Sequence, residues 1–412
     1  NGYIPFLCDL TPYVKYGSVN EVKVQVDHTR YNDSRWYTGS GIYRDVYLVY
    51  ANRVHSSLWG TYCKVEKSSK KQADFLISTS LENESSHKAT VEIQLELKRK
   101  EDGKIVGSSS KKIEIAAGDS LDCKQKIRIS NPEFWSIKSP KLYMLISHIY
   151  VDGKLTETNQ VATGIRHLTF DANKGFALNG EWIKLKGVCL HHDAGCLGSA
   201  VPREVWERRL LNLKSIGCNA IRMSHNPQST DVYDICDEIG LIVLDEAFDE
   251  WEFPKKKWVS GWNVGTPTFD GNYDFFQEWG EKDLRDMVLR DRNHPSIIMW
   301  SIGNEVDYPN DPYSHPVLDK GTINQPVQGG YLPGNPSAER LGNISQKLVD
   351  VVKKYDTSRP VTAALAGVIM SNHTDYPFNI DVCGYNYTED RYETDHKTYP
   401  KRILYGSENG HG

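Results

Sequence analysis

Two glutamates that lie 103 positions apart carry the chemistry that this sequence suggests. Glu305 ends the run Trp300-Ser301-Ile302-Gly303-Asn304-Glu305, and Glu408 ends the run Leu404-Tyr405-Gly406-Ser407-Glu408. An acetal is cleaved through an oxocarbenium-like transition state, in which one carboxyl group protonates the leaving oxygen and a second attacks or stabilises the anomeric carbon. The pair therefore indicates cleavage of a glycosidic bond.

The separation of the two glutamates fits a (β/α)8 barrel. Such a barrel uses about 250 residues, or roughly 31 per unit, so the separation corresponds to about three units. Between the expected strands lie helical patterns with apolar residues at spacings of three and four, over 203–216, 277–291 and 338–354. Short β-rich stretches occur at 183–187, 219–223, 241–245, 297–301, 361–364, 380–384 and 402–406. Glu305 and Glu408 would then follow strands four and seven, at the carboxyl-terminal face where barrel enzymes place their chemistry.

The composition limits the partners. With 412 residues and 39% apolar content, the chain is long enough for two or three globular domains. The net charge is -5, without the excess of basic residues that is typical of nucleic-acid-binding proteins, so we expect no nucleic acid partner. No apolar run approaches the ~18 residues that a membrane helix needs. The eight cysteines are too dilute for a disulfide scaffold and leave the compartment open.

Hydrophobic alternation divides the chain into three parts. Residues 1–52 alternate as strands do and are too few for a whole sandwich, so we interpret them as the second half of a β-sandwich domain. Residues 53–165 have the length and turn spacing of an immunoglobulin-like β-sandwich. Residues 166–412 would form the TIM barrel, entered through a hairpin at Asn179-Gly180. Only four residues follow Glu408, so we expect the last strand and helices to be missing and the chain to be incomplete at both ends.

Longer motifs resemble glycoside hydrolase family 2, which includes β-galactosidases, β-glucuronidases and β-mannosidases. Residues 219–227, from Asn219 to Pro227, are similar to the first signature of that family. Residues 291–305 are similar to the second signature, which is long and specific. Residues 186–193 and 41–46 resemble the segment after the first barrel strand and the end of the sugar-binding jelly roll. The order of domains in the family is jelly roll, immunoglobulin-like domain and barrel.

The resemblance implies roles for four residues. Glu305 would be the acid/base and Glu408 the nucleophile of a retaining mechanism. Asn304, beside the acid, would offer its amide to a sugar hydroxyl, where hydrogen bonds tighten in the transition state. Arg222 would keep the nucleophile ionised through its opposite charge.

The resemblance also bears on metal binding. In metal-dependent members, a glutamate and a histidine in the segment that matches 245–252 bind magnesium near the acid/base. Glu250 keeps the glutamate, but Glu252 stands at the histidine position. We therefore expect no metal and no cofactor, with magnesium dependence in doubt. The lysine-rich stretches at 64–71 and 255–257 are interpreted as solvated loops.

Further candidates for substrate binding follow the expected strands. His191 and His225 are expected to hydrogen-bond sugar hydroxyls. Tyr385 and Tyr387 leave the sixth strand on the same side, and we prefer Tyr387 as the contact of the nucleophile. Asp33, together with Arg35, is a candidate to reach the pocket from the first domain. Three aromatic residues after the third strand could either stack on sugars or pack beneath their loop: Trp251, Trp258 and Trp262.

The sequence thus predicts a retaining exo-β-glycosidase that hydrolyses terminal β-D-galactosides. A β-glucuronidase of the same family is the alternative, and a non-catalytic carbohydrate-binding protein or an inactive fragment is the second alternative. The expected partner is a glycoside or oligosaccharide substrate. The sequence leaves open whether the protein forms a homo-oligomer. The sequence does not distinguish between the periplasm and the cytoplasm of a bacterium as the compartment of this protein.

Overall fold

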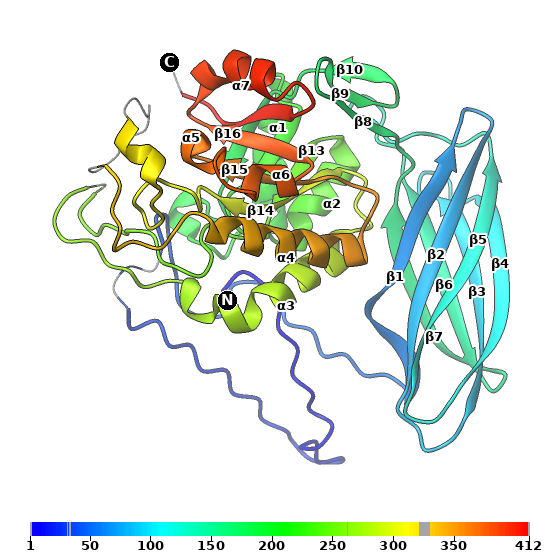
Figure 1. Cartoon of the computed structure of the whole chain (residues 1–412). Helices are drawn as coiled ribbons and strands as arrows, with labels where there is room; N and C mark the ends of the chain where they lie inside the picture. Colours follow the sequence, from blue (N-terminus) through cyan, green and yellow to red (C-terminus); the bar gives the residue numbers. More distant parts are fainter. Residues whose placement is uncertain (1, 31, 33, 262, 321–329, 411–412) are drawn as a thin grey trace.

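The computed structural model describes residues 2–410 apart from residues 31, 33, 262 and 321–329. An extended N-terminal segment runs below a curved parallel sheet with its helices, and a β-sandwich stands beside that sheet (Figure 1). Within the described part of the chain, no helix is both long and apolar enough to cross a membrane.

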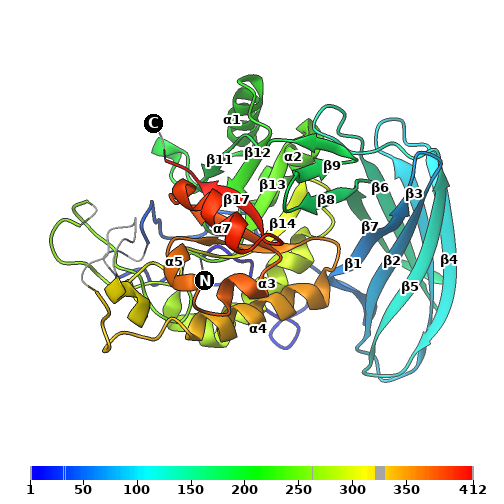
Figure 2. The same cartoon turned by 45° about the horizontal axis from the view of Figure 1, so that its top comes forward.

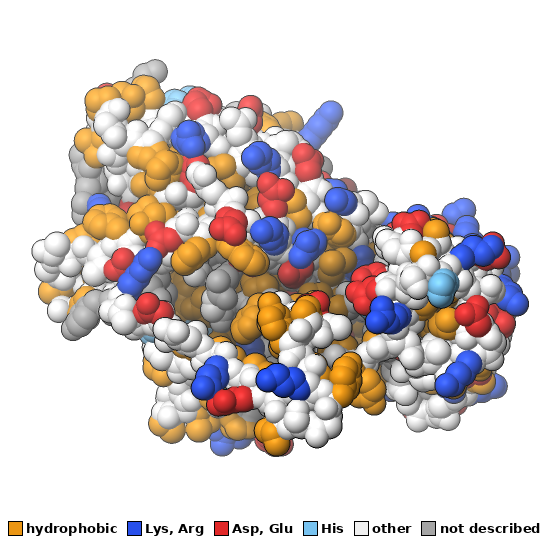
Figure 3. Space-filling model, turned by 90° about the horizontal axis from the view of Figure 1, so that it is seen from below, with side chains coloured by type: hydrophobic (Ala, Val, Ile, Leu, Met, Phe, Trp, Pro, Cys, Tyr) orange, Lys and Arg blue, Asp and Glu red, His pale blue; other side chains and the backbone are white. Residues whose placement is uncertain are grey.

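The N-terminal segment, residues 1–52, differs from the expectation of strands. Its described residues contain no helix and no strand. Val22, Val24 and Val26 alternate as predicted, but all three are exposed. Alternation favours a strand only when a neighbouring strand accepts its backbone hydrogen bonds, and none pairs with this segment in the described residues. Figure 3 shows hydrophobic side chains around a hollow on this underside, which the segment lines. The assignment of residues 1–52 to a jelly roll stays a prediction.

The predicted immunoglobulin-like sandwich has seven strands. They are β1 (Val54–Ser68), β2 (Gln72–Asn83), β3 (Ala89–Arg99), β4 (Ile105–Ile115), β5 (Ser120–Ser130), β6 (Tyr143–Val151) and β7 (Lys154–Thr163). One antiparallel sheet has the order β1-β2-β5 and the other has the order β4-β3-β6-β7. In β3, every second side chain from Val91 to Leu97 is buried, because alternate residues of a strand point to the same face.

A small antiparallel sheet connects the sandwich to the barrel. It contains β8 (Leu168–Asp171), β9 (Gly175–Leu178) and β10 (Glu181–Ile183). The turn between β9 and β10 is at Asn179-Gly180, as expected, and both residues have positive φ, 54° and 85°. Asparagine followed by glycine tolerates this left-handed backbone, which the tight hairpin turn requires.

The parallel sheet has seven strands in chain order; Figures 1 and 2 together label them. They are β11 (Gly187–Leu190), β12 (Ala220–Met223), β13 (Ile242–Glu246), β14 (Ile297–Asn304), β15 (Val361–Leu365), β16 (Val382–Asn386) and β17 (Ile403–Glu408). The expectation of a partial TIM barrel is confirmed. The first strand was expected at 183–187 but begins at Gly187, because Ile183 ends β10 and packs with Leu185 in the cluster beneath the barrel. The thiol of Cys189 lies 3.6 Å from the carbonyl oxygen of Ser407, which brings β11 close to β17.

Helices connect the strands and cover the outside of the curved sheet (Figures 1 and 2). They are α1 (Arg203–Ser215), α2 (Thr230–Ile239), α3 (Tyr273–Asp291), α4 (Arg340–Tyr355), α5 (Val368–Ser371), α6 (Tyr376–Asn379) and α7 (Tyr392–Thr398). Short 3-10 turns occupy Gly195–Leu197, Pro316–Lys320 and Glu389–Arg391. In α4, Leu341, Leu348 and Val352 are buried at helical spacing, which places one apolar face against the sheet.

Candidate active site

The two glutamates lie at the carboxyl ends of their strands. Glu305 directly follows β14, and Glu408 is the last residue of β17. Both side chains are mostly buried, with 8% and 14% of their surface exposed. Parallel strands end at one edge of the sheet, so side chains that follow different strands can meet there.

Glu408 is held by two hydrogen bonds. Arg222 Nη1 donates to Oε1 over 2.7 Å, and the Tyr387 hydroxyl donates to Oε2 over 2.6 Å. His225 Nε2 lies 3.6 Å from Oε1. Burial by itself would raise the pKa of Glu408, but the charges of Arg222 and His225 and these hydrogen bonds lower it to about 2. The carboxylate is therefore ionised at neutral pH, which suits a nucleophile.

Arg222 is fixed by a second carboxylate, Glu246, at the end of β13. Arg222 Nη2 lies 2.8 and 2.7 Å from the two oxygens of Glu246, which also accepts from the Ser301 hydroxyl at 2.7 Å. Burial disfavours the charged form of Glu246, yet Arg222 and a 2.7 Å contact with His225 Nδ1 keep its pKa below the ordinary value. Removing one member of such a buried pair leaves the other charge without compensation.

Asn304 and Asn386 connect Arg222, the partner of Glu408, to Glu305. Arg222 Nη2 donates to Asn304 Oδ1 over 2.9 Å. Asn386 Nδ2 donates to the same oxygen over 3.1 Å and to Glu305 Oε1 over 3.2 Å. Asn386 Oδ1 in turn accepts from the Ser407 hydroxyl at 2.6 Å. Glu305 and Glu408 are thus linked through three hydrogen-bonded side chains in one buried network.

Glu305 has a left-handed backbone, with φ of 47°. Its N–H donates to the carbonyl of Ala364 over 2.7 Å, which ties the residue to β15. Its Oε2 lies 3.4 Å from both terminal nitrogens of Arg35, a residue of the N-terminal segment. A non-glycine residue in this region costs of order 1 kcal/mol or more, so the surrounding contacts must hold it.

Three aromatic rings, Trp36, His191 and His225, cluster together, and His225 contacts Glu408. The ring of Trp36 lies 5.2 Å from that of His191 and 5.4 Å from that of His225. Burial and the neighbouring His225 lower the pKa of His191 to about 4, so its imidazole is neutral at neutral pH. In the described part of the chain, the buried His191 Nδ1 has no hydrogen-bond partner. A neutral imidazole with an unused nitrogen suits a sugar hydroxyl.

The remaining predicted residues are placed as follows. Tyr387 contacts Glu408, whereas the buried Tyr385 donates to Asp395 over 2.8 Å. Trp251 is 1% exposed and donates from its indole to the carbonyl of Ile302, so it belongs to the core. Asp33 and Trp262 lie outside the described residues.

The interpretation of 255–257 as a solvated loop is wrong for two of its three residues. Lys255 is 2% exposed and Lys257 is 1% exposed. Lys255 Nζ lies 2.9 Å from Asp249 Oδ1, and Lys257 Nζ lies 2.7 Å from Glu250 Oε2. A charge run is usually solvated, but carboxylates buried in the same loop can pair with the ammonium groups and offset the cost of their burial.

The residues do not fit the magnesium site of metal-dependent relatives. Glu250, which would be a ligand, is paired with Lys257. Glu252 turns away to Arg340, with contacts of 2.6 and 2.7 Å. Magnesium is bound by several oxygen ligands that surround the ion. Here the ammonium group of Lys257 occupies the space beside the Glu250 oxygen where the ion would lie.

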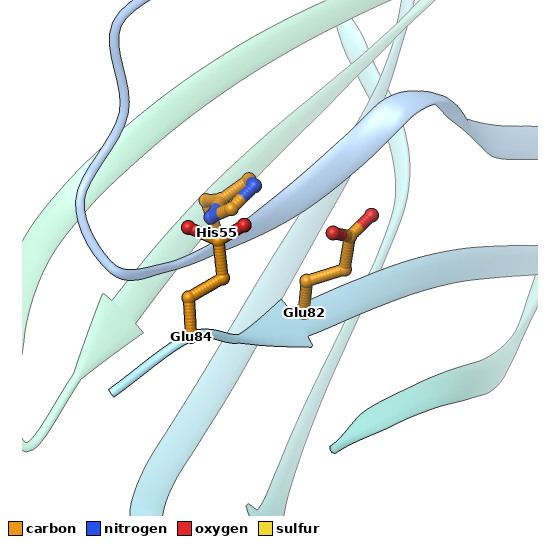
Figure 4. Close-up of side chains that lie close together, drawn as sticks. All are labelled: His55, Glu82 and Glu84. Atoms are coloured by element: carbon orange, nitrogen blue, oxygen red, sulfur yellow. The ribbon is translucent and has the colours of Figure 1, made fainter. Parts of the chain in front are cut away.

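Two other groups of side chains in the described part of the chain have metal-ligand types close together. His55, Glu82 and Glu84 are on the sandwich, with ligand atoms within 4.8 Å of one another (Figure 4). Glu84 is exposed, and such surface groups often exist without an ion. In the second group, His294 Nδ1 lies 2.6 Å from Asp237. Burial lowers the pKa of His294, but Asp237 outweighs it and raises the pKa to about 9, so this group is an ion pair.

Sequence reasoning did not find Glu246, Asp249, Asn386 or Trp36. Glu246 and Asn386 end β13 and β16, and the rule that chemistry follows barrel strands could have selected both. Asp249 lies in the segment compared with the metal loop. Nothing in the sequence was a reason to select Trp36 apart from its place next to Arg35. The place of its ring in the site depends on how the N-terminal segment crosses the barrel, which the sequence pattern does not show.

Comparison with known proteins gives a consistent assignment. The family model described as "Glycosyl hydrolases family 2, TIM barrel domain" matches residues 171–401, and "Glycosyl hydrolases family 2" matches residues 57–166. β-Galactosidase BoGH2A of Bacteroides ovatus is 40% identical over 392 residues, which are 94% of this chain and 44% of that protein. A putative β-glucuronidase of Formosa agariphila is 36% identical over 304 residues, which are 74% of this chain and 27% of that protein.

Among solved structures, a glycosyl hydrolase family 2 member from Bacteroides cellulosilyticus superposes with a TM-score of 0.80 at 32% identity. The match covers 97% of this chain and 48% of that one. The chain therefore spans less than half the length of each of these relatives. With both family models matched in order along the sequence, this chain belongs to glycoside hydrolase family 2.

Proposed function

We propose that this chain carries the catalytic centre of a retaining β-glycosidase that removes terminal β-D-galactosyl residues. The observation that carries the proposal is the ionised Glu408, linked to Glu305 through Arg222, Asn304 and Asn386. A retaining glycosidase needs one carboxylate that is ionised when it attacks the anomeric carbon and another carboxyl group that exchanges a proton.

In the first step, a Glu408 oxygen bonds to the anomeric carbon while the bond from that carbon to the leaving oxygen breaks. Glu305 gives its proton to the leaving oxygen. In the second step, Glu305 takes a proton from water, the water oxygen bonds to the anomeric carbon and Glu408 leaves as a carboxylate. Asn304 and His191 would bind sugar hydroxyls, and Arg222 and Tyr387 would stabilise the charge on Glu408.

Galactose is proposed because the relative named as a β-galactosidase matches at 40% identity over 94% of the chain. A β-glucuronidase is the second candidate, because relatives with that name match at 36% and 31% identity. A non-catalytic binding protein is disfavoured, since a binder would not need a nucleophile whose pKa is held near 2.

Two measurements on the full-length protein test the proposal. Nitrophenyl β-galactoside and nitrophenyl β-glucuronide should differ in kcat/KM, with the galactoside faster; the reverse order would move the assignment to glucuronides. A mechanism-based fluoroglycoside should label Glu408, as found by peptide mass spectrometry, and Glu408→Gln should not be labelled. An enzyme that turns over but is labelled on another residue would contradict the role of Glu408.

The division of labour between the glutamates can be tested with one further variant. Glu305→Ala should spare substrates with good leaving groups, which need little protonation, and azide should restore part of its rate. An equal loss on activated and unactivated substrates would count against Glu305 as the acid. Glu408→Gln should lose both, because no glycosyl-enzyme can form.

A further inference from the structure

Lys255 is buried directly beneath the residues that lead into the proposed acid/base. It lies in the loop after β13, and its side chain is 2% exposed. Taking an ammonium group out of water costs several kcal/mol unless partners replace the water. Lys255 must therefore have strong partners in the fold, and these partners indicate what Lys255 does.

The Lys255 ammonium bridges a carboxylate and a backbone carbonyl. Nζ lies 2.9 Å from Asp249 Oδ1 and donates to the carbonyl oxygen of Asn304 over 2.6 Å. That carbonyl belongs to the peptide group that joins Asn304 to Glu305. Asn304 Nδ2 also donates to Asp249 Oδ1 over 2.8 Å, so Asp249 and Lys255 hold Asn304 by its side chain and by its backbone.

This contact fixes a strained conformation. Glu305 has φ of 47°, and its own N–H is bound to Ala364. The peptide group before Glu305 is thus held at its carbonyl by Lys255 and at its N–H by β15. With both ends fixed, the Glu305 carboxylate is directed toward the network of Asn386 and Arg35.

The local charges balance without an added ion. Arg35 and Lys255 both contact Asp249, and Arg35 also reaches Glu305. Burial and Arg35 lower the pKa of Lys255 below its ordinary value, and Asp249 and Glu305 offset only part of that shift. Despite its burial, the pKa of Asp249 is held well below its ordinary value by Arg35 and Lys255, so it stays ionised beside the ammonium group. There is also little free space in the loop, since a Cβ on Gly271 would come within 2.8 Å of Lys257 Nζ.

We propose that Lys255 is a positioning residue for the acid/base, an internal cation that orients the Asn304–Glu305 peptide where a bound divalent ion does not fit. This inference rests on the proposed function, because Lys255 acts only through Glu305. Its effect should appear in proton transfer to the leaving group and not in the attack by Glu408.

The test compares leaving groups in the full-length protein, with aryl glycosides of whichever sugar the wild type hydrolyses. Lys255→Met keeps the length of the side chain and removes its charge. A displacement of about 1 Å at a catalytic group costs on the order of 100-fold in rate, so kcat on the phenyl glycoside should fall by about that factor. On the dinitrophenyl glycoside, whose leaving group needs little protonation, the fall should be only about threefold.

Lys257→Met is the matched control. Lys257 is as buried as Lys255 and is also paired with a carboxylate, but it does not contact Asn304. This control should lower the melting temperature and keep the wild-type ratio of the two rates. An equal loss on both substrates for Lys255→Met would overturn the inference, because a general structural role would produce that pattern.

A second arm uses the wild-type protein and does not depend on the folding of a variant. Chelation should leave its activity within about twofold, and magnesium should add nothing. A large loss that magnesium restores would overturn the inference. If Lys255→Met does not fold, Lys255→Arg, which keeps the charge, should retain a ratio of the two rates close to that of the wild type. A ratio shifted by about 30-fold would contradict the proposal. A wild-type protein that hydrolyses no glycoside would refute the proposed function. If the wild type is active and Lys255→Met loses the same factor on both glycosides, only this inference is refuted.

Discussion

Removing the hydroxyl of Tyr387 should slow the second step of the reaction more than the first. The hydroxyl donates to Glu408 Oε2 over 2.6 Å, and this bond is stronger when Glu408 is a carboxylate than when it is bonded to the sugar. The bond therefore favours departure of Glu408 from the anomeric carbon. In Tyr387→Phe that departure loses its assistance, and the glycosyl-enzyme should accumulate.

The magnitude follows from the geometry. A hydrogen bond to a charged group contributes about 1.5–3 kcal/mol, and the lower end applies because Tyr387 is 44% exposed. A loss of about 1.4 kcal/mol is tenfold in rate. We expect kcat to fall about tenfold and KM to fall with it, because an accumulating intermediate lowers both. The pKa of Glu408 should rise by about one from its value near 2, which leaves it ionised at neutral pH.

The assay is steady-state kinetics together with a stopped-flow measurement of nitrophenol release. Tyr387→Phe should show a burst equal to the enzyme concentration, followed by slow turnover. Tyr385→Phe is the control, since its hydroxyl binds Asp395 and it should lose stability but keep kcat. If kcat fell while KM rose and no burst appeared, Tyr387 would be assisting substrate binding and the reasoning would be refuted.

Three further predictions concern the same network. Asn386→Ala should lower the free energy of unfolding by about 1–3 kcal/mol, measured by urea denaturation, because Ser407 loses its buried acceptor. The folded-state pKa of Glu408, about 2, lies below its ordinary 4.5, so its stabilisation is present above 4.5 and is lost as the pH falls toward 2. The melting temperature of Glu408→Gln should therefore fall less than that of the wild type over this range, and equal falls would contradict the assignment. Trp36→Ala should raise KM by roughly tenfold with little change in melting temperature, because the ring packs on His191 and His225, the proposed sugar contacts.

The sequence was sufficient for the barrel because its five middle strands, β12 to β16, are buried on both faces. Such strands appear as short apolar runs, as in β13 and β14, where every residue is buried. The first strand was misplaced because Ile183 and Leu185 are equally apolar but pack beneath the barrel. The strands expected in residues 1–52 were not found, since alternation describes the faces of a strand and not whether a partner lies beside it.

Site residues could be predicted from the sequence where they lie at the ends of barrel strands, because the strand ends meet at one edge of the sheet. Glu305, Glu408, Arg222 and Asn304 lie at the ends of predicted strands, and the structure connects all four in one network. The loop after β13 gave no such guide. Lys255 looked like part of a solvated charge run, and only the tertiary structure brings Asp249 and the Asn304 carbonyl to its ammonium group.

The balance of charges in the site bears on which glutamate exchanges protons. Four carboxylates, Glu246, Asp249, Glu305 and Glu408, meet Arg35, Arg222 and Lys255 there, and His225 contacts two of the four. The cations hold the pKa values of Glu246, Asp249 and Glu408 below the ordinary range. These three carboxylates are therefore ionised in the free protein near neutral pH. In the proposed mechanism the proton for the leaving group comes from Glu305, and the position of Glu305 depends on the whole buried network.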